Sequence, residues 1–89
     1  MIKTQTLIIN KLGLHARAAS KLVTTAMAFQ SHISIGQSEH MADAKNIMSV
    51  MMLAASKGTE LQLEVEGSDE QLACEAVLDL INRRFDEEE

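Results

Sequence analysis

The chain has 89 residues and a formal net charge of −5, and 46% of its residues are hydrophobic although only two are aromatic. This length predicts one domain, residues 1–89, with a modest aliphatic core. No apolar run is long enough to span a membrane, no secretory signal is visible, and the single cysteine cannot form an internal disulfide. We therefore expect a cytoplasmic monomer that does not insert into membranes.

The charges are unevenly distributed along the chain. Residues 1–57 hold six Lys/Arg and two Asp/Glu, a net charge of +4, whereas residues 58–89 hold two and eleven, a net charge of −9. The overall acidity and the absence of Tyr and Trp argue against a nucleic-acid partner. An anionic small group or an acidic protein fits the basic half better. The acidic tail, 86–89, is expected to be a solvated end, with a role in partner choice as the alternative.

The first half of the chain predicts one long helix among short strands. Residues 3–9, rich in Thr and Ile, indicate a strand, and residues 32–36 and 39–42 indicate two more. Between them, residues 16–29 predict a helix because apolar side chains recur at helical spacing. Its core side is expected to consist of Ala19, Leu22, Val23, Ala26 and Phe29.

The second half predicts two helices around a strand. Residues 45–55 indicate a short helix that Asn46 caps and that ends before Gly58. Residues 59–66 alternate between apolar and acidic or amide side chains, which is typical of a strand with one buried face. Ser68 and Gln71 form the pattern of a capping box, and the last helix is expected to run to about residue 84. Its core side is expected to consist of Leu72, Ala73, Ala76, Val77, Leu80 and Ile81.

The predicted order of elements is β-α-β-β-α-β-α. Each alternating strand has one apolar face, and three helices are available to cover it. The fold class is therefore α+β, a single antiparallel sheet with helices on one face.

The stretch from Gly13 to Arg17 carries the strongest indication of chemistry. Gly13 permits a tight turn into the helix, and His15 then lies at the helix N-terminus, where unpaired backbone N–H groups and the helix dipole favour phosphate. The donors are expected to be the backbone N–H groups of Ala16, Arg17 and Ala18. The guanidinium of Arg17 adds a planar fork suited to phosphate oxygens. A phosphoryl group carried on His15 is the functional interpretation, and an ordinary surface histidine near a helix cap is the alternative.

These residues resemble a known family. The segment 11–19, KLGLHARAA, is similar to the active-site signature of HPr, the histidine-containing phosphocarrier of the bacterial phosphotransferase system. Residues 45–61 resemble the second helix and final strand of that family, and residues 80–87 resemble its nitrogen-related branch, NPr. The resemblance implies an open-faced β-sandwich with a four-stranded antiparallel sheet and three helices.

The resemblance also implies a function. Enzyme I would take a phosphoryl group from phosphoenolpyruvate and transfer it to Nδ1 of His15, where Arg17 would stabilise the phosphate. The phosphoryl group would then pass to a histidine of an enzyme IIA protein. Sugar transport and nitrogen-type regulation both remain open as the process served. No cofactor or metal is implied, and no turnover independent of the partner proteins is expected. Family members regulated by HPr kinase carry Ser at the position of Asn46, so we expect that switch to be absent here.

The second predicted helix is apolar around most of its circumference. One interpretation is a deeply buried helix; the other is a docking patch of Ile47, Met48 and Met51, since methionine suits surfaces that serve several partners. In the family this face adjoins the first helix and meets both enzyme I and enzyme IIA. The facing positions on the first helix are Ala16, Ser20, Thr24 and Met27.

Two other functions remain open beside the phosphocarrier. The chain could be a non-catalytic regulatory module that binds through the Ile47, Met48 and Met51 patch, or a domain that holds a small anionic ligand at the helix N-terminus. His32 and His40 have no spacing that suggests a metal site. Cys74 is expected to be a small packing residue.

Overall fold

The computed structural model describes all residues, 1–89. Four strands form one sheet in the order β1-β4-β2-β3, and every neighbouring pair is antiparallel. This confirms the predicted order of elements and the predicted fold class. The elements are β1 (Ile2–Leu7), α1 (Ala16–Met27), β2 (His32–Gln37), β3 (His40–Asp43), α2 (Ile47–Met52), β4 (Glu60–Glu66), α3 (Glu70–Asn82) and a final turn over Arg84–Asp86.

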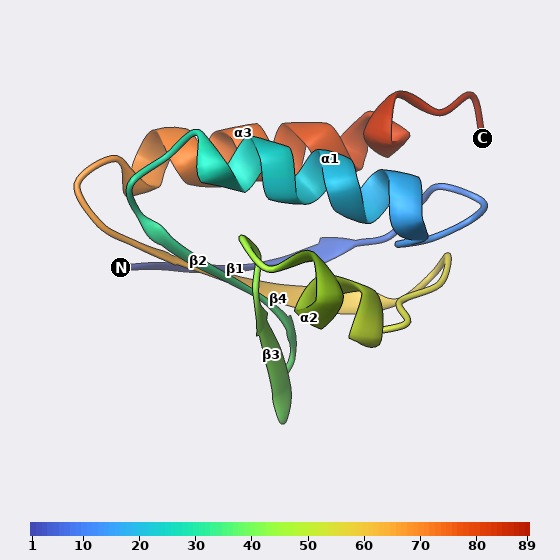
Figure 1. Cartoon of the computed structure of the whole chain (residues 1–89), viewed down its shortest axis with the longest axis horizontal. Coiled ribbons are helices and arrows are strands. Elements are labelled where there is room, and N and C mark those ends of the chain that lie inside the picture. Colours follow the sequence, from blue (N-terminus) through green and yellow to red (C-terminus); the bar gives the residue numbers. More distant parts are fainter.

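The helices form a layer on one face of the sheet. Helices α1 and α3 lie side by side and run in opposite directions, and α2 contacts α1 and β3 (Figure 1). The C-terminus therefore reaches the end of the molecule where α1 begins (Figure 1). The opposite face of the sheet carries polar side chains, with Lys3 paired across the strands with Glu64 and Gln5 with Gln62. This is the open-faced sandwich that the sequence predicts.

The core lies between the sheet and the helices. In β4, Leu61, Leu63 and Val65 are almost fully buried while the residues between them face outward, as the alternation predicts. Leu72 is a wrong prediction, because 65% of it is exposed. Ala73 and Cys74 take the inward positions of the first turn of α3, and Leu72 lies about 100° around the helix from Ala73.

The predicted capping box of α3 is also wrong. Asp69 occupies the N-cap position, and its carboxylate accepts hydrogen bonds from the backbone N–H groups of Gln30 and Ser31, each at 2.9 Å. The Gly67 N–H donates instead to Glu70 Oε1 at 3.2 Å. The loop between α1 and β2 needs acceptors for its N–H groups, and this tertiary requirement prevails over the local capping pattern.

Helix α2 is shorter than predicted. Asn46 caps it as expected, accepting from the Ser49 N–H at 3.1 Å, but the helix ends at Met52. Ala54 then adopts a positive φ of 51°, so the chain leaves the helix before Gly58 is reached. The turn brings the carbonyl of Ala55 within 2.8 Å of the Leu14 N–H, and this bond replaces a further helical turn.

The C-terminal end is not simply solvated, contrary to the expectation from its charge. Phe85 is fully buried, and Glu87 is bonded to residues far away in the sequence. Helix α3 ends at Asn82, and Arg84, Phe85 and Asp86 all have positive φ, at 59°, 54° and 65°. This left-handed turn redirects the chain at the end of α3, and Phe85 enters the core there.

Candidate functional site

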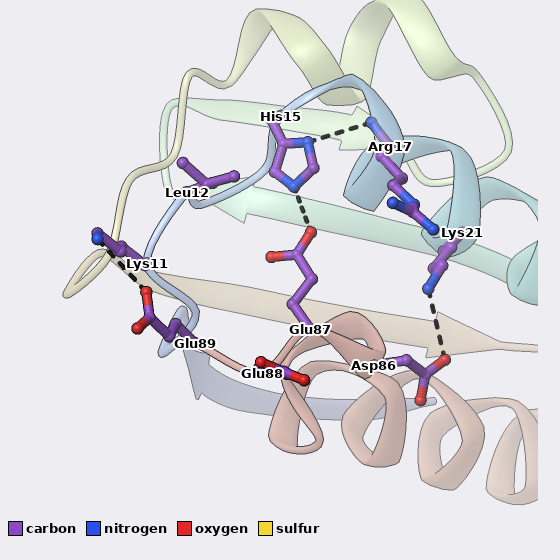
Figure 2. A pocket seen from close by; sticks show the side chains of 9 residues that line it. All are labelled: Lys11, Leu12, His15, Arg17, Lys21, Asp86, Glu87, Glu88 and Glu89. Atoms are coloured by element: carbon purple, nitrogen blue, oxygen red, sulfur yellow. Dashed lines mark hydrogen bonds and ion pairs between the residues drawn. The ribbon is translucent and has the colours of Figure 1, made fainter.

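His15 is the N-cap residue of α1. Its backbone is extended, with φ −72° and ψ 176°, and its side chain turns back onto the helix. Nδ1 accepts a hydrogen bond from the backbone N–H of Arg17 at 3.3 Å (Figure 2). A ring nitrogen with its lone pair therefore faces the positive end of a helix dipole, where the first N–H groups have no partner in the helix. This is a suitable position for an anion attached to that nitrogen.

The loop before His15 depends on Gly13. Gly13 has φ +68°, and a Cβ placed there would lie 2.4 Å from the carbonyl oxygen of Ala55 and 2.8 Å from Cα of Ser56. The next residue, Leu14, donates its N–H to that same carbonyl. The tight turn predicted from Gly13 is present, and it packs directly against the segment that follows α2.

The other side of the His15 ring meets the C-terminal end of the chain. Nε2 is hydrogen-bonded to Oε2 of Glu87 (Figure 2). The second carboxylate oxygen of Glu87 accepts from Nδ2 of Asn10 at 2.9 Å. Burial acts to raise the pKa of the Glu87 carboxyl, but the hydrogen bonds from Asn10 and His15 outweigh it and bring that pKa below its usual value. Glu87 is therefore ionised at neutral pH.

Arg17 extends from the first turn of α1 next to the His15 ring (Figure 2). It is exposed and takes no part in the ion pairs that Lys11 and Lys21 form with the tail. Nζ of Lys11 lies 3.3 Å from Oε2 of Glu89, and Nζ of Lys21 donates to the carbonyl of Phe85 at 2.8 Å. Of the cations around the ring, Arg17 is the one free to bind an incoming anion.

The site has mixed charge, which the division into a basic and an acidic half did not anticipate. A shallow hollow beside His15 is lined on one side by basic residues of the N-terminal segment and α1 and on the other by acidic residues of the tail (Figure 2). The fold returns the acidic end onto the basic half because α3 runs back antiparallel to α1. A purely electropositive surface is therefore absent at His15. The hollow is lined by Lys11, Leu12, His15, Arg17, Lys21, Asp86, Glu87, Glu88 and Glu89.

The residues expected to dock partners are all exposed. Met27 and Met48 are each 65% exposed, and Ile47 and Met51 are 38% and 39% exposed. In α2 only Val50 is buried, so the interpretation of α2 as a deeply buried helix is wrong. Helices α1 and α2 contact each other, and the facing positions expected on α1, Ala16, Ser20 and Thr24, are exposed as well.

The remaining sequence candidates lie away from this site. His32 shares a hydrogen bond with Ser34 at 3.1 Å, and His40 begins β3 in the open. Cys74 is a buried packing residue of α3, as expected. No three His, Cys, Asp or Glu side chains come together as metal ligands would, and no helix has the length and apolarity to traverse a bilayer.

Sequence reasoning missed Asn10 and Glu87 as parts of the site. They are 77 positions apart, and neither belongs to a periodic pattern. The one available signal was Phe85, an aromatic residue among charges near the end of the chain, which is typical of a tail that docks on a core.

Comparison with known proteins shows the family to which this chain is similar. Residues 2–83 match the family model described as the PTS HPr component phosphorylation site. A phosphocarrier protein HPr of Pseudomonas aeruginosa is 54% identical over 83 residues, which cover 92% of each chain. A phosphocarrier protein NPr of Shewanella violacea is 40% identical and covers 97% of this chain and 94% of its own.

A solved structure agrees with these sequence relatives. The crystal structure of an HPr protein from Thermoanaerobacter tengcongensis superposes with a TM-score of 0.95 at 42% identity, covering the whole of both chains. The fold, the histidine at the start of α1 and the family match all lead to one conclusion: this chain belongs to the HPr family of phosphocarrier proteins of the phosphotransferase system.

Proposed function

We propose that this protein accepts a phosphoryl group on Nδ1 of His15 and passes it to a second protein. The observation that carries the proposal is the orientation of the ring, whose Nδ1 faces the Arg17 N–H at the start of α1. A phosphoryl group on Nδ1 would take that N–H as a donor to one of its oxygens. The N–H groups of Ala16 and Ala18 supply further donors, and the guanidinium of Arg17 supplies a fork for two oxygens.

The partners we propose are enzyme I as donor and an enzyme IIA protein as acceptor. Each would present a histidine close to His15 while its own surface covers α1 and α2. The exposed side chains of Met27, Ile47, Met48 and Met51 supply apolar contact for both, and methionine adapts to differently shaped partners. With no lysine among them, contact depends more on burial than on charge.

Met48 and Met52 offer a matched test of this docking surface. Both are exposed, at 65% and 80%, but Met52 lies toward His40 and Leu53, outside the proposed patch. We expect Met48→Glu to slow phosphorylation by enzyme I at least about tenfold, because a charge is buried in the interface, whereas Met52→Glu leaves the rate near that of the native protein. Equal effects of the two substitutions would show that the patch is wrongly assigned.

The branch served and the regulation are part of the same proposal. The nitrogen-type ending of the chain favours regulation over sugar uptake, and a monomer acting in the cytoplasm fits a relay between two proteins. Asn46 caps α2 without a hydroxyl, so HPr kinase and ATP should leave no phosphoserine on this chain. A kinase-dependent phosphoserine would contradict that part.

The central experiment is the intact mass of the protein after incubation with enzyme I and phosphoenolpyruvate, beside His15→Ala. We expect one acid-labile, alkali-stable phosphoryl adduct on the native chain and none on the variant. Absence of the adduct with both sugar-type and nitrogen-type enzyme I, while a control carrier is labelled, would overturn the proposal. It would favour a non-catalytic module acting through the Ile47, Met48 and Met51 patch, whose binding His15→Ala would spare.

A further inference from the structure

Four groups form a continuous chain of hydrogen bonds through the His15 ring. Asn10 Nδ2 donates to Glu87 Oε1, Glu87 Oε2 is bonded to Nε2 of His15, and the backbone N–H of Arg17 donates to Nδ1 of His15. A backbone N–H is only a donor, so Nδ1 must present its lone pair. In the neutral ring the proton then lies on Nε2, where it donates to the Glu87 carboxylate.

Asn10 is built to hold Glu87. It is fully buried, and its Nδ2 donates both to Glu87 and to the carbonyl of Gly13, each at 2.9 Å. Its own Oδ1 is buried and has no hydrogen-bond partner. Rotating the amide would place Oδ1 against two acceptors, so the two Nδ2 bonds fix its orientation at the expense of the unpaired oxygen.

Burial and hydrogen bonding hold the tail at His15 against the strain of its backbone. Three consecutive residues, Arg84 to Asp86, adopt left-handed backbone angles, each costing roughly 1–2 kcal/mol. Such a turn persists only where its surroundings determine it. Here the turn is stabilised by the burial of Phe85 in the core. It is also stabilised by Lys21, whose Nζ donates to the Phe85 carbonyl and lies 3.6 Å from Oδ2 of Asp86.

We propose that Glu87, oriented by Asn10, is a positioning residue that sets the tautomer of His15 and stabilises the charge that its ring gains on phosphorylation. This inference rests on the proposed function of His15. A carboxylate next to Nε2 keeps the proton there and leaves Nδ1 free as the nucleophile. The arrangement corresponds to the carboxylate that orients the catalytic histidine of a Ser-His-Asp triad.

The transfer step shows where the charge appears. The Nδ1 lone pair forms a bond to phosphorus as the bond from phosphorus to the donor's histidine nitrogen breaks, and that bond's electron pair stays on the donor nitrogen. The proton on Nε2 does not leave, so the His15 ring becomes a cationic phosphoimidazolium against the Glu87 carboxylate. On transfer to the acceptor the Nδ1–P electron pair returns to His15, and the ring is neutral again.

Glu87→Gln tests this proposal with Glu88→Gln as its control. The first substitution removes the charge at Nε2 and keeps the shape, whereas Glu88 lines the same hollow and makes no bond to the ring. The ¹⁵N shifts of the His15 ring, recorded in alkaline buffer, report which nitrogen carries the proton. We expect Nε2–H alone in the native protein and in Glu88→Gln, and a measurable share of Nδ1–H in Glu87→Gln.

The rate of phosphorylation by phospho-enzyme I is the second measurement. A hydrogen bond to a charged acceptor is about twice as strong as one to a neutral acceptor, so we expect about a tenfold loss in Glu87→Gln and little change in Glu88→Gln. A native tautomer and rate in Glu87→Gln, or equal losses in both variants, would overturn the inference. The tautomer is measured without a partner protein. If the native protein is never phosphorylated, the proposed function is refuted, and the NMR signals alone then decide whether Glu87 sets the tautomer of His15.

Discussion

Gly13→Ala should destabilise the protein because the new methyl group would meet two backbone atoms too closely. Gly13 has φ +68°, and the new methyl group would meet the Ala55 carbonyl oxygen at 2.4 Å and Ser56 Cα at 2.8 Å, both of them backbone atoms that cannot rotate away. Gly58→Ala is the matched control. Gly58 also has positive φ, at +91°, but nothing lies within 4 Å of its Cβ position.

The two substitutions share one cost and differ in another. Left-handed backbone costs alanine roughly 1–2 kcal/mol at either position. At Gly13 the carbonyl of Ala55 must also move away from the Leu14 N–H, which it now accepts at 2.8 Å, and a buried donor left unpaired costs about 1–3 kcal/mol. We expect a total loss of about 3 kcal/mol for Gly13→Ala and about 1 kcal/mol for Gly58→Ala.

Urea unfolding monitored by circular dichroism measures both losses. For a domain of this size 1 kcal/mol corresponds to about 4–8 °C in Tm, so thermal unfolding gives an independent reading. Unchanged m-values would show that only stability has changed. Equal losses for the two variants would refute the argument, since they would mean that the loop at Gly13 moves away from Ala55 without cost.

Three further predictions concern other parts of the fold. The hydrogen bond from Ser31 and those from nearby backbone N–H groups hold the pKa of Asp69 below its usual value. The ionised Asp69 therefore stabilises the fold fully above the pKa that it has in the unfolded chain, and this stabilisation is lost as the pH falls through the lowered pKa of the folded protein. The difference in urea midpoint between the native protein and Asp69→Asn should shrink below about pH 4. Phe85→Ala should cost about 3–5 kcal/mol because the ring is fully buried, against less than about 0.5 kcal/mol for the exposed Leu72→Ala; similar urea midpoints would show that the tail does not stabilise the core. Burial raises the pKa of the Cys74 thiol, so a disulfide reagent at pH 8 should label the folded chain far more slowly than the unfolded chain, and equal rates would contradict the buried position.

The features that the sequence predicted well are those that a single element determines. The alternation of Leu61, Leu63 and Val65 specifies the buried face of β4, and the spacing of alanines and leucine specifies that of α1. The features predicted wrongly depend on a second element. Asp69 caps a neighbouring loop rather than following the Ser68 pattern, and α2 ends early because Leu14 needs an acceptor.

The candidate site divides in the same way. Gly13, His15 and Arg17 are close together in the sequence, so a loop followed by a helix N-terminus was enough to place them. Glu87 reaches His15 because α3 runs antiparallel to α1 and ends near the start of α1, where a left-handed turn redirects the chain. Neither composition nor periodicity records such a change of direction, and a run of acidic residues has the same sequence whether it is solvated or docked.

The proposed nucleophile, His15, and the proposed docking surface are held by the same junction. The loop that carries His15 is bonded to the segment after α2 through Leu14 and Ala55, and to the tail through Asn10 and Glu87. The His15 ring itself is oriented on one side by the Arg17 N–H and on the other by Glu87. Because it is ordered before a partner binds, the entropic cost of ordering it in a complex is lower. Phosphoryl transfer between two histidines needs the reacting atoms about 3–3.5 Å apart, and a displacement of about 1 Å can cost about a hundredfold in rate. Gly13→Ala, which pushes this junction apart, should therefore slow transfer by more than the small unfolded fraction explains, even where most of the protein remains folded.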